Sequence, residues 1–187
     1  MNTLPPLPTP ELPIGPRFAL DRRVCVAANR WGARRLVGLF FGVVSRLGDG
    51  IFWYALMAVL AVVGGDRGWI AAAHMAVTGL VALLLYRLLK RWTRRPRPYR
   101  ACPGVIAHVP PLDEFSFPSG HTLQAVSFSM VAIAWYPSLA PLLLGFSSLV
   151  AASRVILGLH YPSDLLAAMA IGGSLGATSL WLFPLPI

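Results

Sequence analysis

The chain has 187 residues, the length of one domain, and 56% of them are hydrophobic, above the roughly 45–50% usual in soluble domains. Its 16 basic residues, against 7 acidic ones, give a net charge of +9. This composition indicates a membrane protein and leaves too little soluble surface for a nucleic-acid-binding module, so we expect no nucleic acid partner. The basic excess makes anionic lipid headgroups the expected general partner.

The amino-terminal region divides into two predicted segments. Prolines crowd the first 20 residues, which predicts an irregular tail over 1–20 and no cleavable signal peptide. Arginines then interrupt an apolar segment over 21–47. A basic helix with one oily face is typical of the membrane interface, so we predict an interfacial amphipathic helix there. The alternative is that residues 36–44 form part of a sixth membrane span.

The rest of the chain, 48–187, reads as a transmembrane domain. Four stretches have the roughly 20 apolar residues that a helix needs to cross the hydrocarbon core, namely 69–89, 120–136, 139–157 and 165–183. A fifth stretch, 51–64, is shorter and reaches spanning length by adding 47–50 and tilting. We therefore predict an all-α, polytopic membrane helix bundle with about five transmembrane helices, six if the alternative holds.

Three polar clusters interrupt the boundaries of these spans. Five crossings place the loop 92–118, the turn 158–163 and the amino-terminal segment on one side of the bilayer, so all three clusters share a face and predict one composite site. The clusters are Lys90 with Arg97-Pro98, then Pro118-Ser119-Gly120-His121, then Ser153-Arg154 with His160 and Asp164.

Lys90, Arg97 and Arg154 have the chemistry of a phosphate site. Arginine offers a planar fork that matches phosphate oxygens, and lysine supplies a point charge. Taken alone, Lys90 and its neighbouring arginines could equally be a cytoplasmic stop-transfer cluster that follows the positive-inside bias. The histidines of the other two clusters favour the phosphate site.

Residues 118–121 suit the start of a helix. Ser119 can cap it, and Gly120 lets backbone N–H groups approach an anion closely. A plain helix start does not explain His121, because ionisable side chains at the lip of a membrane helix are rare and usually functional.

His160 and Asp164 are four residues apart at the start of the last span. A carboxylate that accepts from one ring nitrogen leaves the other nitrogen free to attack. Asp164 would also suit the amino terminus of any helix. His121, His160 and Asp164 could in principle bind a metal, but no metal-ligand spacing is present and the arginines would repel a divalent cation, so we expect no metal and no cofactor. His74, inside a span, is expected to form a hydrogen bond between helices.

The ordered spacing of the three clusters resembles the signature of the type 2 phosphatidic acid phosphatase (PAP2) superfamily over residues 51–183. The resemblance implies that His160 attacks phosphorus to give a phosphohistidine and that Asp164 orients it. It implies that His121 protonates the leaving oxygen and then helps to activate water. By the same resemblance, phosphate oxygens are held without a metal by Lys90, Arg97, Ser119, Gly120 and Arg154.

The resemblance predicts a bacterial inner-membrane, multi-pass phosphatase for a lipid phosphate or diphosphate such as phosphatidic acid, phosphatidylglycerophosphate or undecaprenyl diphosphate. The alternative is a membrane protein that binds or transports anionic lipids without chemistry. Relatives commonly open their pocket to the periplasm, whereas the amino-terminal arginines favour a cytoplasmic active face. Neither the lipid nor the oligomeric state follows from the sequence.

Overall fold

A computed structural model describes residues 16–185, and this part of the chain consists of helices and loops without a strand. Residues 1–15 of the predicted irregular tail over 1–20 lie outside the described residues. From Pro16 onward the chain is already helical, so the tail prediction is wrong for 16–20.

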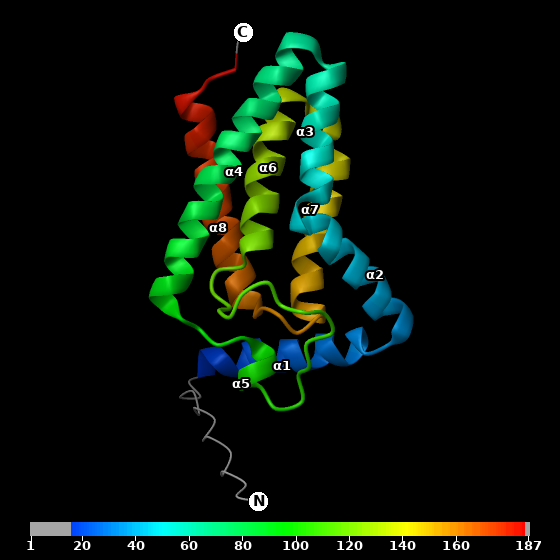
Figure 1. Cartoon of the computed structure of the whole chain (residues 1–187). Helices are drawn as coiled ribbons and strands as arrows, with labels where there is room; N and C mark the ends of the chain where they lie inside the picture. The colour runs from blue at the N-terminus through cyan, green and yellow to red at the C-terminus, as the bar shows by residue number, and fades with distance from the viewer. Residues whose placement is uncertain (1–15, 186–187) are drawn as a thin grey trace, which may run out of the picture.

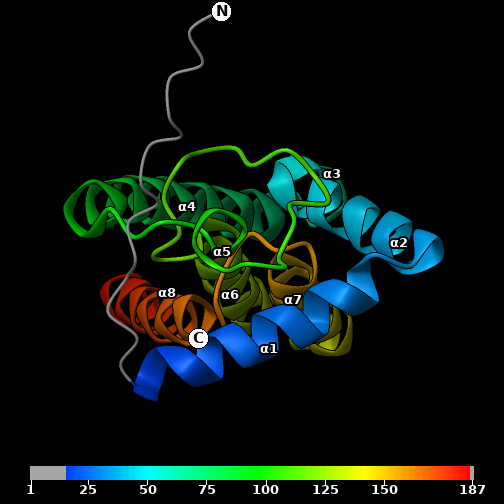
Figure 2. The same cartoon turned by 90° about the horizontal axis from the view of Figure 1, so that it is seen from below.

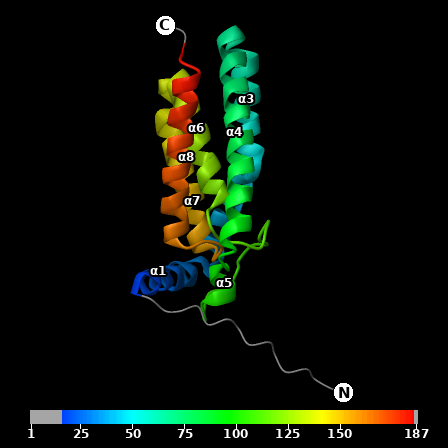
Figure 3. The same cartoon turned by 90° about the vertical axis from the view of Figure 1, so that its left-hand side faces the viewer.

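The long helices of the chain run side by side in a bundle (Figures 1 and 3). Four helical stretches are long and apolar enough to cross a bilayer: Arg35–Val63, Gly65–Thr93, Pro137–Ile156 and Pro162–Leu182. The fifth, α6 (Gly120–Trp135), has 16 residues and packs at the centre against α4 (Gly65–Thr93), α7 (Ala140–Ile156) and α8 (Pro162–Leu182). The prediction of an all-α membrane helix bundle is confirmed.

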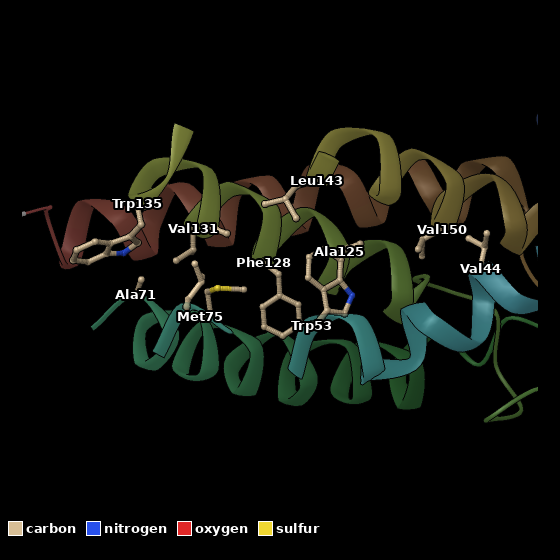
Figure 4. Close-up of a cluster of buried hydrophobic side chains, with 12 residues drawn as sticks. Val44, Trp53, Ala71, Met75, Ala125, Phe128, Val131, Trp135, Leu143 and Val150 are labelled. Carbon is tan, nitrogen blue, oxygen red and sulfur yellow. The ribbon is translucent and has the colours of Figure 1, made fainter. Parts of the chain in front are cut away.

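The bundle is apolar inside and outside, as expected for a protein whose solvent is lipid. Its interior is filled by large side chains, among them Trp53, Phe128 and Leu143 (Figure 4). Glycines let the helices approach closely, because a Cβ at Gly172 of α8 would lie 2.6 Å from the carbonyl oxygen of Leu123 in α6. Large hydrophobic side chains also cover the outer surface, including those of Val62, Leu80, Leu84, Leu166 and Trp181.

His74 joins three helices inside the bundle. Its Nε2 lies 2.7 Å from Ser179 Oγ of α8, and the indole of Trp135 in α6 donates to its Nδ1 at 3.1 Å. The predicted interhelical hydrogen bond of His74 is confirmed.

The segment predicted as one interfacial helix over 21–47 is two helices. The first, α1 (Pro16–Gly32), lies across one end of the bundle (Figures 1 and 2). The second, α2 (Arg35–Arg46), continues through a five-residue turn, Leu47–Ile51, into α3 (Phe52–Val63). No charge interrupts the sequence between Arg35 and Arg46, so this part continues the first span, close to the alternative considered above. It lengthens that span and does not create a sixth.

Buried polar side chains hold α1 to the end of the bundle. Asn29 donates to the carbonyl oxygens of Ile106 at 2.8 Å and Ile156 at 3.2 Å. Asp21 accepts from the backbone N–H of Ser163 at 3.1 Å. The loop between α4 and α6, which contains the short helix α5 (Pro98–Ala101), covers the same end (Figure 2). This covered end contains the candidate site.

Candidate active site

A cavity of about 610 Å³ opens at the end of the bundle that α1 and the long loop cover. Six of the eight predicted site residues line it, although they come from five different segments of the chain. These are Lys90, Arg97, Gly120, His121, Arg154 and His160. The other two, Ser119 and Asp164, are fully buried behind it. The three sequence clusters therefore meet in one place.

The three cations of the site are almost completely buried. Lys90 is 6% exposed, Arg97 1% and Arg154 2%. Buried charge is costly unless it is paired and hydrogen-bonded, so this group needs anionic partners. The cavity is thus built to hold negative charge.

Asp113 from the long loop supplies part of that charge. The Lys90 ammonium donates to both carboxylate oxygens of Asp113 at 2.7 Å, and Arg97 Nη2 donates to Oδ1 at 2.8 Å. Burial alone would raise the pKa of Asp113, but the two cations outweigh it and lower that pKa below its ordinary value. Asp113 is therefore ionised and lies against two of the three cations predicted to bind phosphate.

His160 lies in the turn between α7 and α8 and is fully buried. Arg97 Nη1 lies 3.2 Å from His160 Nε2. Because an arginine can only donate, Nε2 accepts and the ring proton is on Nδ1. Burial, and then the charges of Arg97, Arg154 and Lys90, hold the pKa of His160 well below its ordinary value. The ring is neutral, and its Nε2 lone pair points toward Arg97 and accepts a hydrogen bond from it.

Asp164 stands behind His160 at the start of α8. Its Oδ2 lies 3.6 Å from His160 Nδ1, longer than a hydrogen bond, and accepts from the backbone N–H of Tyr161 at 2.9 Å and from the hydroxyl of Ser116. Catalytic hydrogen bonds are often long in the absence of substrate. The carboxylate is thus on the correct side of the ring to orient it.

Arg95 connects Asp164 to α1. Its Nη1 donates to Asp164 Oδ1 at 2.6 Å, and its Nη2 donates to Asp21 Oδ2 at 2.9 Å. The guanidinium also lies over the ring of Tyr161, 4.0 Å from its centroid. The sequence offered no signal for this role, because Arg95 is one of several arginines close together in this stretch of the chain.

Ser119, Gly120 and His121 form the start of α6. Ser119 is its N-cap and accepts from the backbone N–H of Thr122 at 3.4 Å. Gly120 packs on Tyr86, since a Cβ there would lie 3.2 Å from the ring. His121 Nε2 contacts Asp49 Oδ1 at a short hydrogen-bond distance. Asp49 was missed by the sequence interpretation, although an acidic residue within a predicted span is itself a signal of function.

The fold and this site define a polytopic membrane protein with a buried anion pocket at one end of its helices. Residues 67–185 match the PAP2 superfamily, and the chain belongs to that superfamily.

Curated relatives carry related names. Decaprenylphosphoryl-5-phosphoribose phosphatase of Mycobacterium tuberculosis is 32% identical over 123 residues, which cover 66% of each chain. Phosphatidylglycerophosphatase B of Escherichia coli is 40% identical over 73 residues, which cover 36% of this chain and 29% of the relative. The matched region is thus about two thirds of the mycobacterial relative and less than one third of the other.

Two solved structures share the fold. A transmembrane PAP2 type phosphatidylglycerolphosphate phosphatase from Bacillus subtilis matches with a TM-score of 0.74 and 22% identity, covering 91% of this chain and 87% of that one. LpxE of Aquifex aeolicus matches with a TM-score of 0.75 and 23% identity, covering 93% and 99%.

Proposed function

We propose that this protein is an integral membrane phosphatase that hydrolyses the phosphomonoester or diphosphate of a lipid through a phosphohistidine intermediate. The observation that carries the proposal is the convergence of three buried cations and two histidines on one cavity at the end of membrane-spanning helices. Family membership and the names of the relatives support the same activity.

The arrangement supports a two-step reaction. In the first step, Nε2 of His160 attacks phosphorus in line with the bond to the lipid oxygen. That bond breaks, its electron pair goes to the oxygen, and His121 supplies the proton. Lys90, Arg97 and Arg154 stabilise the charge that spreads over the phosphoryl oxygens. The products of this step are the dephosphorylated lipid and a phosphohistidine.

In the second step, water attacks phosphorus and gives its proton to the now neutral His121. The electron pair of the P–N bond returns to Nε2 of His160, and inorganic phosphate leaves. Asp164 stabilises the positive charge on the ring while phosphorus is bound. We infer that the site residues require no metal, because the three cations supply the charge that a metal would bring.

The position of the cavity supports a lipid substrate. It lies where spanning helices end, so a headgroup can enter while its chains remain in the bilayer. Arg87 and Arg91 also line the cavity, beyond the three buried cations, and supply charge for a second anionic group. Candidate substrates with such a group are undecaprenyl diphosphate and phosphatidylglycerophosphate, and phosphatidic acid is the simplest monoester.

We propose a location in the bacterial inner membrane with the site on the cytoplasmic side. Exposed arginines gather at the site end on α1, α2 and the end of α4, and such an excess favours the cytoplasm. Labelling of a cysteine at the exposed Glu114 position, from either side of sealed vesicles, tests this orientation.

The activity is tested by phosphate release from the three candidate lipids by the purified full chain in detergent with a chelator. We expect release by the wild type, none by His160→Ala, and a trapped acid-labile phosphoenzyme that His160→Ala lacks. A wild type that binds these lipids and releases no phosphate would support the alternative, a non-catalytic lipid-binding protein.

A further inference from the structure

The turn between α2 and α3 has an unusual backbone for the middle of a membrane helix. Leu47–Ile51 contain a kink between the two helices, at which Gly50 has φ 139° and ψ −30°. Only glycine adopts this φ readily. The helix therefore bends here by a specific local device (Figure 1).

Glycine also brings the turn close to the site. A Cβ at Gly48 would lie 3.0 Å from Val150 Cγ2 in α7 and 3.8 Å from His121 Cδ2 in α6. In the sequence Gly48-Asp49-Gly50, the first glycine lets the backbone pack closely against α7 and α6, and the second allows the helix to bend after Asp49. The consequence is that Asp49, on a largely apolar stretch of helix, lines the active cavity.

Two polar side chains of this region reach the site, one helical turn apart. The hydroxyl of Ser45 accepts from Arg154 Nη1, and Asp49 Oδ1 contacts His121 Nε2. The side chains of His121 and Asp49 are 11% and 23% exposed, so His121 is largely and Asp49 partly shielded from water. The amino-terminal span therefore supports one residue of each of the last two sequence clusters.

We propose that Asp49 is a positioning residue for His121: it holds the ring in place and favours its protonated form, which donates the proton to the leaving oxygen. This inference rests on the proposed phosphatase function. It gives the amino-terminal span, which lies outside the three clusters, a part in the reaction.

The charges around His121 explain the need for a carboxylate. Arg154 of α7 and Lys90 of α4 face it in the cavity, with His160 from the turn before α8. Burial and the positive charges of Arg154 and Lys90 disfavour a protonated imidazole at His121. Asp49 is the acidic side chain in contact with the ring, and its negative charge offsets part of this effect.

The chemistry of the first step shows where the proton is needed. When the bond between phosphorus and the lipid oxygen breaks, an alkoxide forms unless a proton arrives. The proton passes from His121 to that oxygen, which leaves His121 neutral and Asp49 still ionised. A general acid of this kind contributes roughly 10²- to 10⁴-fold to a rate. The contribution is large for a poor leaving group, and small for a leaving group that is stable as an anion.

The test compares Asp49→Asn with the wild type on dioleoyl phosphatidic acid, an alkyl ester, and p-nitrophenyl phosphate, an aryl ester. The full-length purified chains are used in detergent over a range of pH. We expect kcat for phosphatidic acid to fall about 10- to 100-fold, in the range for loss of a supporting partner, and p-nitrophenyl phosphate hydrolysis to change less than about threefold. The alkaline limb of the pH–rate profile moves to lower pH in Asp49→Asn, and Asp49→Glu restores it in part.

Asp66→Asn is the matched control, because it removes one acidic charge from the exposed first turn of α4, at the other end of the bundle. We expect it to behave as the wild type. Equal losses on both substrates with an unmoved pH profile would assign Asp49 a purely structural role and overturn the inference, as would an unchanged variant. A wild type that releases phosphate from neither of these substrates nor from the other two candidate lipids would instead overturn the proposed function, and the inference with it.

Discussion

The ammonium of Lys90 donates to both carboxylate oxygens of Asp113, and Nζ lies 2.7 Å from each. The same carboxylate accepts a hydrogen bond from Arg97. Asp113 of the loop therefore already neutralises part of the positive charge that would bind the proposed phosphate. A substrate phosphate bound by Lys90 and Arg97 would have to displace Asp113 from both cations.

The first prediction concerns this competition. In Asp113→Asn the cations lose a negative partner, so inorganic phosphate should bind more tightly. We expect its inhibition constant to fall about 3- to 10-fold, as for loss of one charge-assisted hydrogen-bond partner. The measurement is phosphate inhibition of turnover at fixed pH and ionic strength.

Glu114→Gln provides the control for Asp113→Asn. Glu114 is the next residue, is largely exposed, and lies 3.7 Å from Arg100, so its loss removes the same charge without freeing Lys90. It should leave phosphate inhibition nearly unchanged. Weaker phosphate binding by Asp113→Asn would mean that Asp113 organises the cations and does not compete with the ligand.

The second prediction concerns Arg95, which joins Asp164 to Asp21 of α1. Arg95→Gln removes the charged partner of Asp164, so the carboxylate should orient His160 less well. We expect kcat to fall about 10- to 100-fold with little change in KM. Arg94→Gln, at the neighbouring exposed position, should retain activity. A raised KM with unchanged kcat would place Arg95 in substrate binding.

The sequence predicted the contacts that depend on spacing. Lys90, Arg97, His121, Arg154 and His160 were expected in one site because span counting put their clusters on one face, and they line one cavity. The spacing of each cluster and the alternation of membrane crossings were enough to predict that these residues meet.

Other contacts depend on how distant helices pack, which spacing does not encode. Asp49 reaches His121 because of a bend at Gly50, and Arg95 reaches Asp164 because the long loop folds back over the bundle. The division of 21–47 into two helices was missed because the arginines suggested an interfacial location for the whole segment. Its uncharged second half instead continues into α3.

The third prediction is a pH dependence of stability. Folding holds the pKa of His160 below its ordinary value, whereas a histidine in the unfolded chain titrates near ~6.5. As pH falls below that value, the unfolded chain binds a proton that the folded chain does not, so the free energy of unfolding decreases. His160→Gln should flatten the decrease in thermal unfolding midpoint between about pH 7.5 and 5.

His108→Gln is the control for this pH effect, since His108 lies in the loop and contacts the carbonyl oxygen of Asn29 at 3.2 Å, outside the cavity. It should keep the slope of the wild type. The same slope in all three proteins would show that His160 is not the group whose protonation destabilises the fold.

The fourth prediction tests the packing that places α8, and with it Asp164, against α6. A Cβ at Gly172 would lie 2.6 Å from the carbonyl oxygen of Leu123, a backbone atom that cannot move without shifting α6. Gly172→Ala should therefore destabilise the protein by about 1–3 kcal/mol, as overpacking does.

Gly173→Ala is the control. At this next residue, a Cβ on Gly173 would have its nearest neighbour at 3.9 Å, the Sδ of Met130. Gly173→Ala should thus be neutral or slightly stabilising, because alanine favours the helix. Thermal unfolding of the two variants in one detergent compares them directly, and equal midpoints would mean that α8 does not pack on α6 through Gly172.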